Sequence, residues 1–246
     1  MSDVKIYQKH MKLLNKQLVF IVVSCTVAFA SGHNALAQGP RSNPSSSEPV
    51  AGAFARATAG IGKETPSSID RLSPQNAEMY FNRAVNNINS RNFALALTDM
   101  NKAIALRPSN PNFFKTRAAC FGGMKDYLAA ILDLNEAIRL DPLNPEYFYR
   151  RSVAYEFSRQ FGPALADANR AIQLRPNDPD FLLCPAEIYA DLKNWSAAID
   201  ACTKCIAVNP TSGLAYALRA EAKRNAGDVS GGKEDDSRAF SLGYRD

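Results

Sequence analysis

Histidine is nearly absent from this sequence of 246 residues. The two that occur, His10 and His33, both lie within the first 37 residues. Without that segment the chain cannot assemble a Ser-His-Asp or Cys-His mechanism, because both depend on an imidazole base. It also lacks the usual nitrogen ligand of zinc. We therefore expect no enzyme activity, no catalytic residue, no cofactor and no bound metal.

A long hydrophobic run is also missing. The apolar stretch 18–30 has 13 residues, fewer than the roughly 20 that a transmembrane helix needs. It follows a lysine-rich start and precedes the small-residue pattern Ala35-Leu-Ala37, an order typical of a secretory signal peptide. We predict a signal peptide over 1–37, cleaved after Ala37, a periplasmic or secreted protein, and no stable membrane span after cleavage.

Two alternatives to cleavage after Ala37 remain. The apolar stretch could stay attached as an uncleaved anchor. The residues up to Cys25 also resemble a bacterial lipobox, which would make the protein a lipoprotein. Cys25 lies in the middle of the apolar stretch and not at its end, so lipidation is the weaker hypothesis.

Charge is concentrated in the same segment. Four lysines and one aspartate place +3 of the formal net charge of +5 in the first 37 residues, so the remaining chain carries only +2. A nearly neutral body gives no electrostatic basis for binding nucleic acid. Residues 38–72 are rich in Pro, Ser, Gly and Ala and show no apolar period, so we predict a flexible, disordered linker there.

The rest of the chain repeats itself every 34 residues. Prolines occur at 108, 142, 176 and 210, and aromatic, alanine and aliphatic positions recur in the same register. A fixed period of this length indicates stacked supersecondary units. Apolar residues at helical spacing, broken by short polar turns, predict two helices in each unit. We expect a folded domain over 73–246, with units at about 77–110, 111–144, 145–178, 179–212 and 213–246, the last a degenerate, polar cap.

The repeated pattern resembles the tetratricopeptide repeat (TPR). The signature residues in the second unit are Phe114, Ala118, Phe121, Ala130, Leu134, Ala137 and Pro142. The resemblance covers about 77–246. It implies an all-α, right-handed superhelical solenoid of about five helix-turn-helix units. In this family the first helices line a concave face that holds a peptide or protein segment.

Family geometry places a set of first-helix residues on that concave face. Carboxylates outnumber basic residues in the set, and aromatic residues add apolar anchors, which favours a partner segment with basic and apolar residues. A solvated face without a specific ligand is the alternative. The predicted groove residues are Glu78, Phe81, Val85, Asn112, Lys115, Ala119, Glu146, Tyr149, Val153, Glu156, Asp180, Leu183, Glu187, Ala217 and Glu221.

Charged residues recur at the 34-residue period as well. Arginine recurs on the first helices and aspartate on the second, and both are replaced together in the fourth unit, by Pro185 and Ala201. Joint loss favours ion pairs within a unit, although an arginine stripe that reads a ligand is the alternative. The expected structural pairs are Arg83–Asp99, Arg117–Asp133, Arg151–Asp167 and Arg219–Asp235.

Cysteines cluster in the fourth unit, next to those two replacements. Three interpretations stay open. Cys184 and Cys202 could form a disulfide in an exported protein. Cys202 and Cys205 have the spacing of a thiol-redox motif. The thiols could also simply pack as small apolar groups in the core.

These patterns predict a protein-binding or peptide-binding scaffold in an exported compartment. One alternative is a structural or assembly component of a cell-envelope complex. A second, weaker alternative is a thiol-redox protein that uses Cys202 and Cys205.

Overall fold

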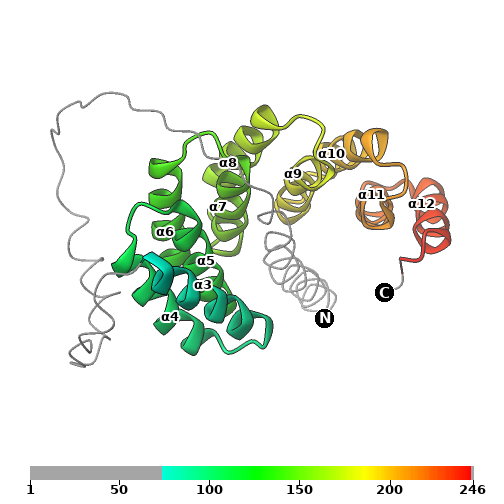
Figure 1. Cartoon of the computed structure of the whole chain (residues 1–246). Helices are drawn as coiled ribbons and strands as arrows, with labels where there is room; N and C mark the ends of the chain where they lie inside the picture. The colour runs from blue at the N-terminus through cyan, green and yellow to red at the C-terminus, as the bar shows by residue number, and fades with distance from the viewer. Residues whose placement is uncertain (1–73, 245–246) are drawn as a thin grey trace, which may run out of the picture. The chain divides into compact units, whose positions relative to one another are not determined.

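The computed structural model describes residues 74–244, and every regular element in that range is an α-helix (Figure 1). The expected all-α architecture of repeated helix-turn-helix units is confirmed. The predicted signal peptide, the alternative lipidation site Cys25 and the predicted linker lie outside the described residues. The helices are α3 (Pro74–Asn89), α4 (Phe93–Leu106), α5 (Pro111–Gly123), α6 (Tyr127–Leu140), α7 (Pro145–Phe157), α8 (Phe161–Leu174), α9 (Pro179–Asp191), α10 (Trp195–Val208), α11 (Gly213–Asn225) and α12 (Val229–Ser241).

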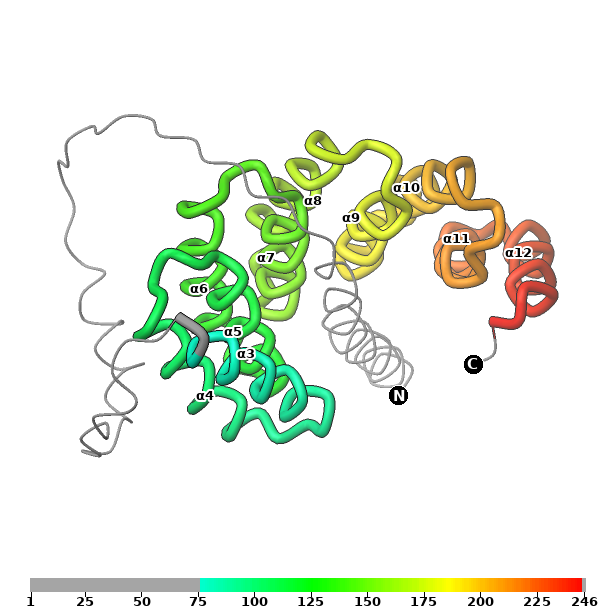
Figure 2. The backbone as a smooth tube through the Cα atoms, in the orientation of Figure 1, coloured from blue at the N-terminus to red at the C-terminus, as the bar shows by residue number. Residues whose placement is uncertain are grey.

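The chain divides into two compact units, one up to Ala129 and one from Ala130 onward. In the first, α3 pairs with α4, and α5 packs against both. In the second, α7 pairs with α8, α9 with α10 and α11 with α12, as the reversals of the backbone in Figure 2 show. The first helices of consecutive pairs also touch, α7 with α9 and α9 with α11. The first helices therefore form a continuous layer within the second unit.

The first helices α5, α7 and α9 each begin with a side-chain cap. The side chains of Asn110, Asn144 and Asp178 accept a hydrogen bond from the backbone N–H two residues later, at 3.1 Å in each case. A proline follows each of them at the first helical position, where its missing N–H has no intrahelical partner to lose. The cap and the proline together define where α5, α7 and α9 start.

The turn between the two helices of each repeat contains one residue in the left-handed backbone conformation. Arg91, Lys125, Arg159 and Lys193 have φ between 57° and 63°, and Gly227 takes the same place with φ of 98°. The next backbone N–H bonds back to the last helical turn, as in Gln160 to the carbonyl of Tyr155 at 2.8 Å. This is the usual helix termination through a left-handed residue. It recurs every 34 residues, so every helix pair reverses in the same way.

Small residues bring the paired helices close together. The alanine columns of the second helices are fully buried, with Ala96, Ala103, Ala164 and Ala171 at 0% exposure. In the last unit Gly232 replaces the alanine of the first column, and a Cβ there would lie 3.0 Å from the carbonyl oxygen of Ala220. The polar helix α12 thus packs against α11 through a position that leaves no room for a larger residue.

Candidate binding surface

The predicted groove residues lie on the first helix of each pair, and most of them are packed and not open to solvent. Phe81, Asp180 and Ala217 retain more exposure, as do three of the glutamates and Asn112. The first-helix face is therefore a tight surface in which apolar and carboxylate side chains are packed together. Its buried members are Val85, Lys115, Ala119, Tyr149, Val153, Glu156, Leu183 and Glu187.

Aromatic rings join consecutive first helices. Phe81 on α3 stacks on Phe113 of α5 with ring centroids 5.3 Å apart. Tyr149 on α7 contacts Phe181 of α9 at the same distance. The residues missed by the sequence analysis, Phe113 and Phe181, belong with Tyr147 to one 34-residue column and are at most 5% exposed. The 34-residue spacing of these aromatic residues was the signal in the sequence that could have identified them. Their packed rings make the surface rigid.

Two buried glutamates form the chemically unusual part of this face. Glu156 ends α7 and Glu187 lies on α9, and they are 4% and 7% exposed. Within residues 74–244, Oε2 of Glu156 is buried without a hydrogen-bond partner. Burial and the nearby charge of Glu187 raise the pKa of Glu156 well above its usual value. Burial, followed by the charges of Asp191 and Asp180, raises the pKa of Glu187 to about 7.

Two other carboxylates of the predicted groove have cationic partners within their own compact unit. Glu78 accepts a hydrogen bond from Arg107 at 2.7 Å. Glu146 accepts two from Arg150, the closer at 2.8 Å. These glutamates are neutralised by the protein itself, whereas Glu156 and Glu187 share a site with further carboxylates. The predicted excess of acidic character is thus concentrated between α7 and α9.

The structure brings together three of the four arginine–aspartate pairs. Arg83 donates to Asp99 at 2.5 and 2.8 Å. Arg151 donates to Asp167 at 2.7 and 2.8 Å, and Arg219 donates to Asp235 at the same two distances. Each is a two-point contact that matches the fork of the guanidinium to the carboxylate. The two members of the fourth pair, Arg117 and Asp133, lie in different compact units, so that pair stays a prediction.

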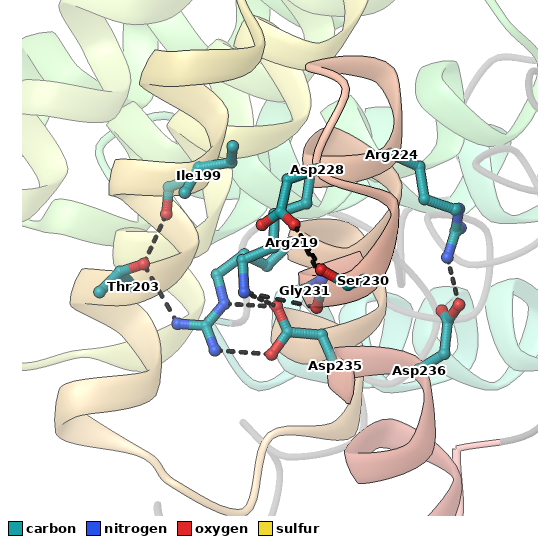
Figure 3. Close-up of polar contacts among 10 residues, drawn as sticks. Ile199, Thr203, Arg219, Arg224, Asp228, Ser230, Gly231, Asp235 and Asp236 are labelled. Atoms are coloured by element: carbon teal, nitrogen blue, oxygen red, sulfur yellow. Dashed lines mark hydrogen bonds and ion pairs between the residues drawn. The ribbon is translucent and has the colours of Figure 1, made fainter. Parts of the chain in front are cut away.

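Each of three arginines also reaches back to the preceding repeat, a contact that the sequence analysis missed. Arg117 donates to Asn101 at 2.8 Å, and Arg151 donates to Asn135 at 2.7 Å. Arg219 donates to the hydroxyl of Thr203 at 3.2 Å while it holds Asp235 (Figure 3). The acceptors form their own 34-residue column, which was the available signal. One guanidinium therefore ties three helices, and this engagement leaves little of it for a ligand.

Electrostatics in the last pair follow from this geometry. Burial alone would raise the pKa of Asp235, but hydrogen bonds from Arg219 and Lys223 outweigh it and lower that pKa. Lys223 lies 2.8 Å from the same carboxylate. A carboxylate held in its charged form by two cations stabilises the folded state at neutral pH.

The fourth repeat lacks this tie. Pro185 occupies the arginine position inside α9 and Ala201 occupies the aspartate position on α10, and both are buried. Asn169, the acceptor position of the preceding repeat, is exposed. The contact between these repeats consequently lacks the arginine tie and keeps apolar packing, the Arg159–Asp191 ion pair and the contact of Ser152 with Cys184.

The proposed disulfide is not formed in the structure. Cys120, Cys184, Cys202 and Cys205 are all buried free thiols. The sulfur of Cys184 lies 3.4 Å from the hydroxyl oxygen of Ser152 on α7, so it faces the preceding pair of helices. Burial raises the pKa of Cys202 to about 12 and of Cys205 to about 11. Such thiols are poor nucleophiles at neutral pH, and their placement fits the core-packing interpretation.

The described range lacks two further kinds of feature. Among residues 74–244, no group of three or more His, Cys, Asp or Glu side chains is arranged to hold a metal ion. None of the helices in that range combines the length and the hydropathy needed to cross a membrane.

Comparison with known proteins gives a consistent assignment of the fold. A family model described as tetratricopeptide repeat matches residues 77–110, the span predicted for the first unit. No match was found among curated proteins.

Several solved structures share the fold. MamA from Desulfovibrio magneticus RS-1 superposes with a TM-score of 0.62 at 15% identity, covering 68% of this chain and 95% of that one. YrrB, described as a TPR protein with an unusual peptide-binding site, has a TM-score of 0.54 at 19% identity, over 68% and 86% of the two chains. PilW, a type IV pilus biogenesis factor, has a TM-score of 0.63 at 16% identity, over 70% and 79%.

Proposed function

We propose that this chain, whose residues 77–110 match the tetratricopeptide-repeat model, is a non-enzymatic scaffold that binds a protein or peptide segment in an exported compartment. The observation that carries the proposal is the first-helix face of α7 and α9, where Tyr149, Leu183, Glu156 and Glu187 bring aromatic, apolar and acidic groups together. Such a face favours an apolar segment with basic residues. Because packed rings hold the helices in place, the receptor would lose little freedom on binding.

The chemistry of the described residues supports binding over catalysis. The candidate nucleophiles of this chain are its thiols. Burial raises the pKa values of Cys202 and Cys205, so both thiols stay protonated at neutral pH. The arginines that could polarise a substrate are held by carboxylates, as in Arg151 with Asp167. A thiol-redox role is therefore the weaker alternative.

The export proposal depends on residues 1–37, whose basic, apolar and small-residue order is that of a signal peptide. Mass spectrometry of the exported protein would test it. We expect a mature chain that begins at Gln38. An intact chain in the cell interior, or a lipid attached to Cys25, would contradict cleavage after Ala37.

Site-specific photo-crosslinking tests the binding face. A photoreactive residue introduced at Ala217 on α11, which is half-buried, should capture a partner in cells that produce the protein. The matched control carries the same group at the exposed Asp200 on α10. Equal capture at both positions would count against a dedicated face. Purification of a stoichiometric multi-protein complex would instead favour the role of an assembly component.

A further inference from the structure

We propose that Glu156 and Glu187 form a receptor for one cationic side chain, a lysine or arginine of the bound segment, and that binding releases a proton. The inference rests on the proposed peptide-binding function and names the feature of the partner that this face would recognise. It commits to a peptide cation as the occupant.

One buried carboxylate oxygen has no hydrogen-bond partner among the described residues. Within residues 74–244, Oε2 of Glu156 is the buried side-chain oxygen that lacks a partner. An unsatisfied buried polar group of this kind costs free energy and calls for an explanation. An ammonium or guanidinium group supplies the donors that a carboxylate accepts, in a charge-assisted hydrogen bond.

Further carboxylates surround the two glutamates. Glu187 and Asp191 act on Glu156, and Asp191 and Asp180 act on Glu187. The cation that acts on Glu156 is Arg159, which already pairs with Asp191 at 3.4 Å. On the neighbouring helices, the charge of Glu187 helps to raise the pKa of the Cys202 thiol on α10, and Asp167 on α8 is held by Arg151. Carboxylates therefore outnumber cations around the pair.

The two glutamates occupy positions whose equivalents in the other repeats can be compared. The two positions are 31 residues apart, and the equivalent positions elsewhere are Ile88 with Ala119, Gly122 with Val153, and Ala190 with Glu221. Both positions carry a carboxylate at the junction of α7 and α9 alone. The coincidence of two acidic residues is thus a local feature and not a property of every repeat.

A peptide cation fits better than a metal ion. No group of three or more metal-binding side chains is assembled within residues 74–244, and divalent calcium takes about 6–8 oxygen ligands. A single ammonium needs only a few acceptors. When it binds, a protonated glutamate gives its proton to solvent and the resulting carboxylate pairs with the ammonium, so charge and protons balance.

The test uses the full chain and two libraries of acetylated peptides with random flanking positions. One library has a fixed central lysine, and the other has norleucine, which keeps the length of the chain and removes the charge. We expect the immobilised protein to retain the lysine library about tenfold better at pH 7. Calorimetry of the best lysine peptide in buffers of different ionisation enthalpy should show proton release.

Three variants locate the effect. Glu156→Gln and Glu187→Gln should each abolish the preference for lysine and the proton release, while norleucine peptides bind as before. Glutamine imitates the protonated glutamate, so both variants should fold, as circular dichroism would verify. The matched control is Glu234→Gln, an exposed glutamate on α12 outside the predicted groove, and it should keep the preference.

Several results would overturn the inference. They are equal retention of the two libraries, a lysine preference that survives both glutamine variants, and stabilisation by calcium chloride that depends on the two glutamates. Photo-crosslinking at Ala217 reports on the proposed function separately. If it captures a partner while the libraries show no lysine preference, the glutamate receptor fails and the scaffold proposal stands. If capture fails as well, both proposals fail.

Discussion

At the scale of single residues, the recurring arginine connects more groups than an ion pair requires. Arg219 holds Asp235 on α12 and Thr203 on α10 from its own place on α11 (Figure 3). Its charge is balanced by a carboxylate that is almost fully buried. Removal of the guanidinium would leave that carboxylate with Lys223 as its remaining cationic partner. The arginine is thus a structural residue, and its loss would destabilise the buried carboxylate of Asp235.

The first prediction follows from this dependence. Arg219→Leu should lower the free energy of unfolding by about 1–3 kcal/mol, because Asp235 loses its two-point partner in a buried place. Urea unfolding would measure the change. The control is Arg224→Leu, which removes an exposed ion pair with Asp236 on the same two helices, and it should cost less than about 1 kcal/mol. Equal losses in the two variants would refute the structural role of Arg219.

A second prediction concerns the buried glutamates and pH. The folded state raises the pKa of Glu187 from 4.5 to about 7, so it binds the proton more tightly than the unfolded state does. The free energy of unfolding should therefore fall as pH rises from about 4.5 to about 7 and then level off. Thermal melts across this range should be flatter for Glu187→Gln. Glu221→Gln should keep the original slope, and an identical slope in all three proteins would contradict the prediction.

At the scale of elements, the inter-helix turn sets the geometry of each pair. Four of the five turns place a basic residue in the left-handed region, and one places a glycine there. A side chain with a Cβ pays a steric cost of about 1 kcal/mol in this conformation. Arginine and lysine at the end of a helix also interact favourably with its negative C-terminal dipole. In these turns, favourable electrostatic interaction with the helix dipole offsets part of the steric cost of the left-handed conformation.

The turns give a third prediction with opposite outcomes at equivalent positions. Lys193→Gly should raise the free energy of unfolding by up to about 1 kcal/mol, because glycine adopts φ near 57° without the steric cost. Gly227→Ala should lower it by about 1–2 kcal/mol, since open space around its Cβ position leaves only the cost of φ. Thermal melts would compare them. Lys193→Ala keeps the strain, and a gain equal to that of Lys193→Gly would point to charge as the cause.

The fourth repeat allows a test by restoration. Pro185→Arg combined with Ala201→Asp should rebuild the tie between α9 and α10 and offer a donor to Asn169 on α8. The two changes should be coupled favourably by about 1 kcal/mol in a double-mutant cycle, because either one alone buries an unpaired charge. Urea unfolding of the four proteins gives the coupling energy. Simple additivity would show that these positions do not meet as they do in the other repeats.

At the scale of the whole chain, the 34-residue period contained most of the architecture. Pro108, Pro142 and Pro176 each lie two residues after the end of α4, α6 and α8, because proline can follow a helix but not continue it. The replacement of the arginine by Pro185 and of the aspartate by Ala201 in one repeat pointed to ion pairs within repeats, as found for Arg151 with Asp167. Residues that recur at the period of the fold, such as these prolines and ion pairs, can be identified from the sequence alone.

Other features depended on three-dimensional packing that composition does not reveal. Family geometry placed Glu187 and Tyr149 on the groove face but did not indicate that both would be at most 7% exposed there. The adjacent positions of Cys184 and Cys202 suggested a disulfide, yet the thiol of Cys184 faces Ser152 on another helix pair. The direction of a side chain around its helix decides such contacts, and residue spacing alone fixes it only to within a turn.

The missing tie around Pro185 has a consequence for how the molecule melts. In a linear array each repeat is stabilised only by its immediate neighbours, so a weak joint cannot be compensated from a distance. Heat or denaturant would part the repeats first at this joint, and the segments on either side would lose structure in separate steps. The protein would then show a broadened unfolding curve in place of a single sharp transition.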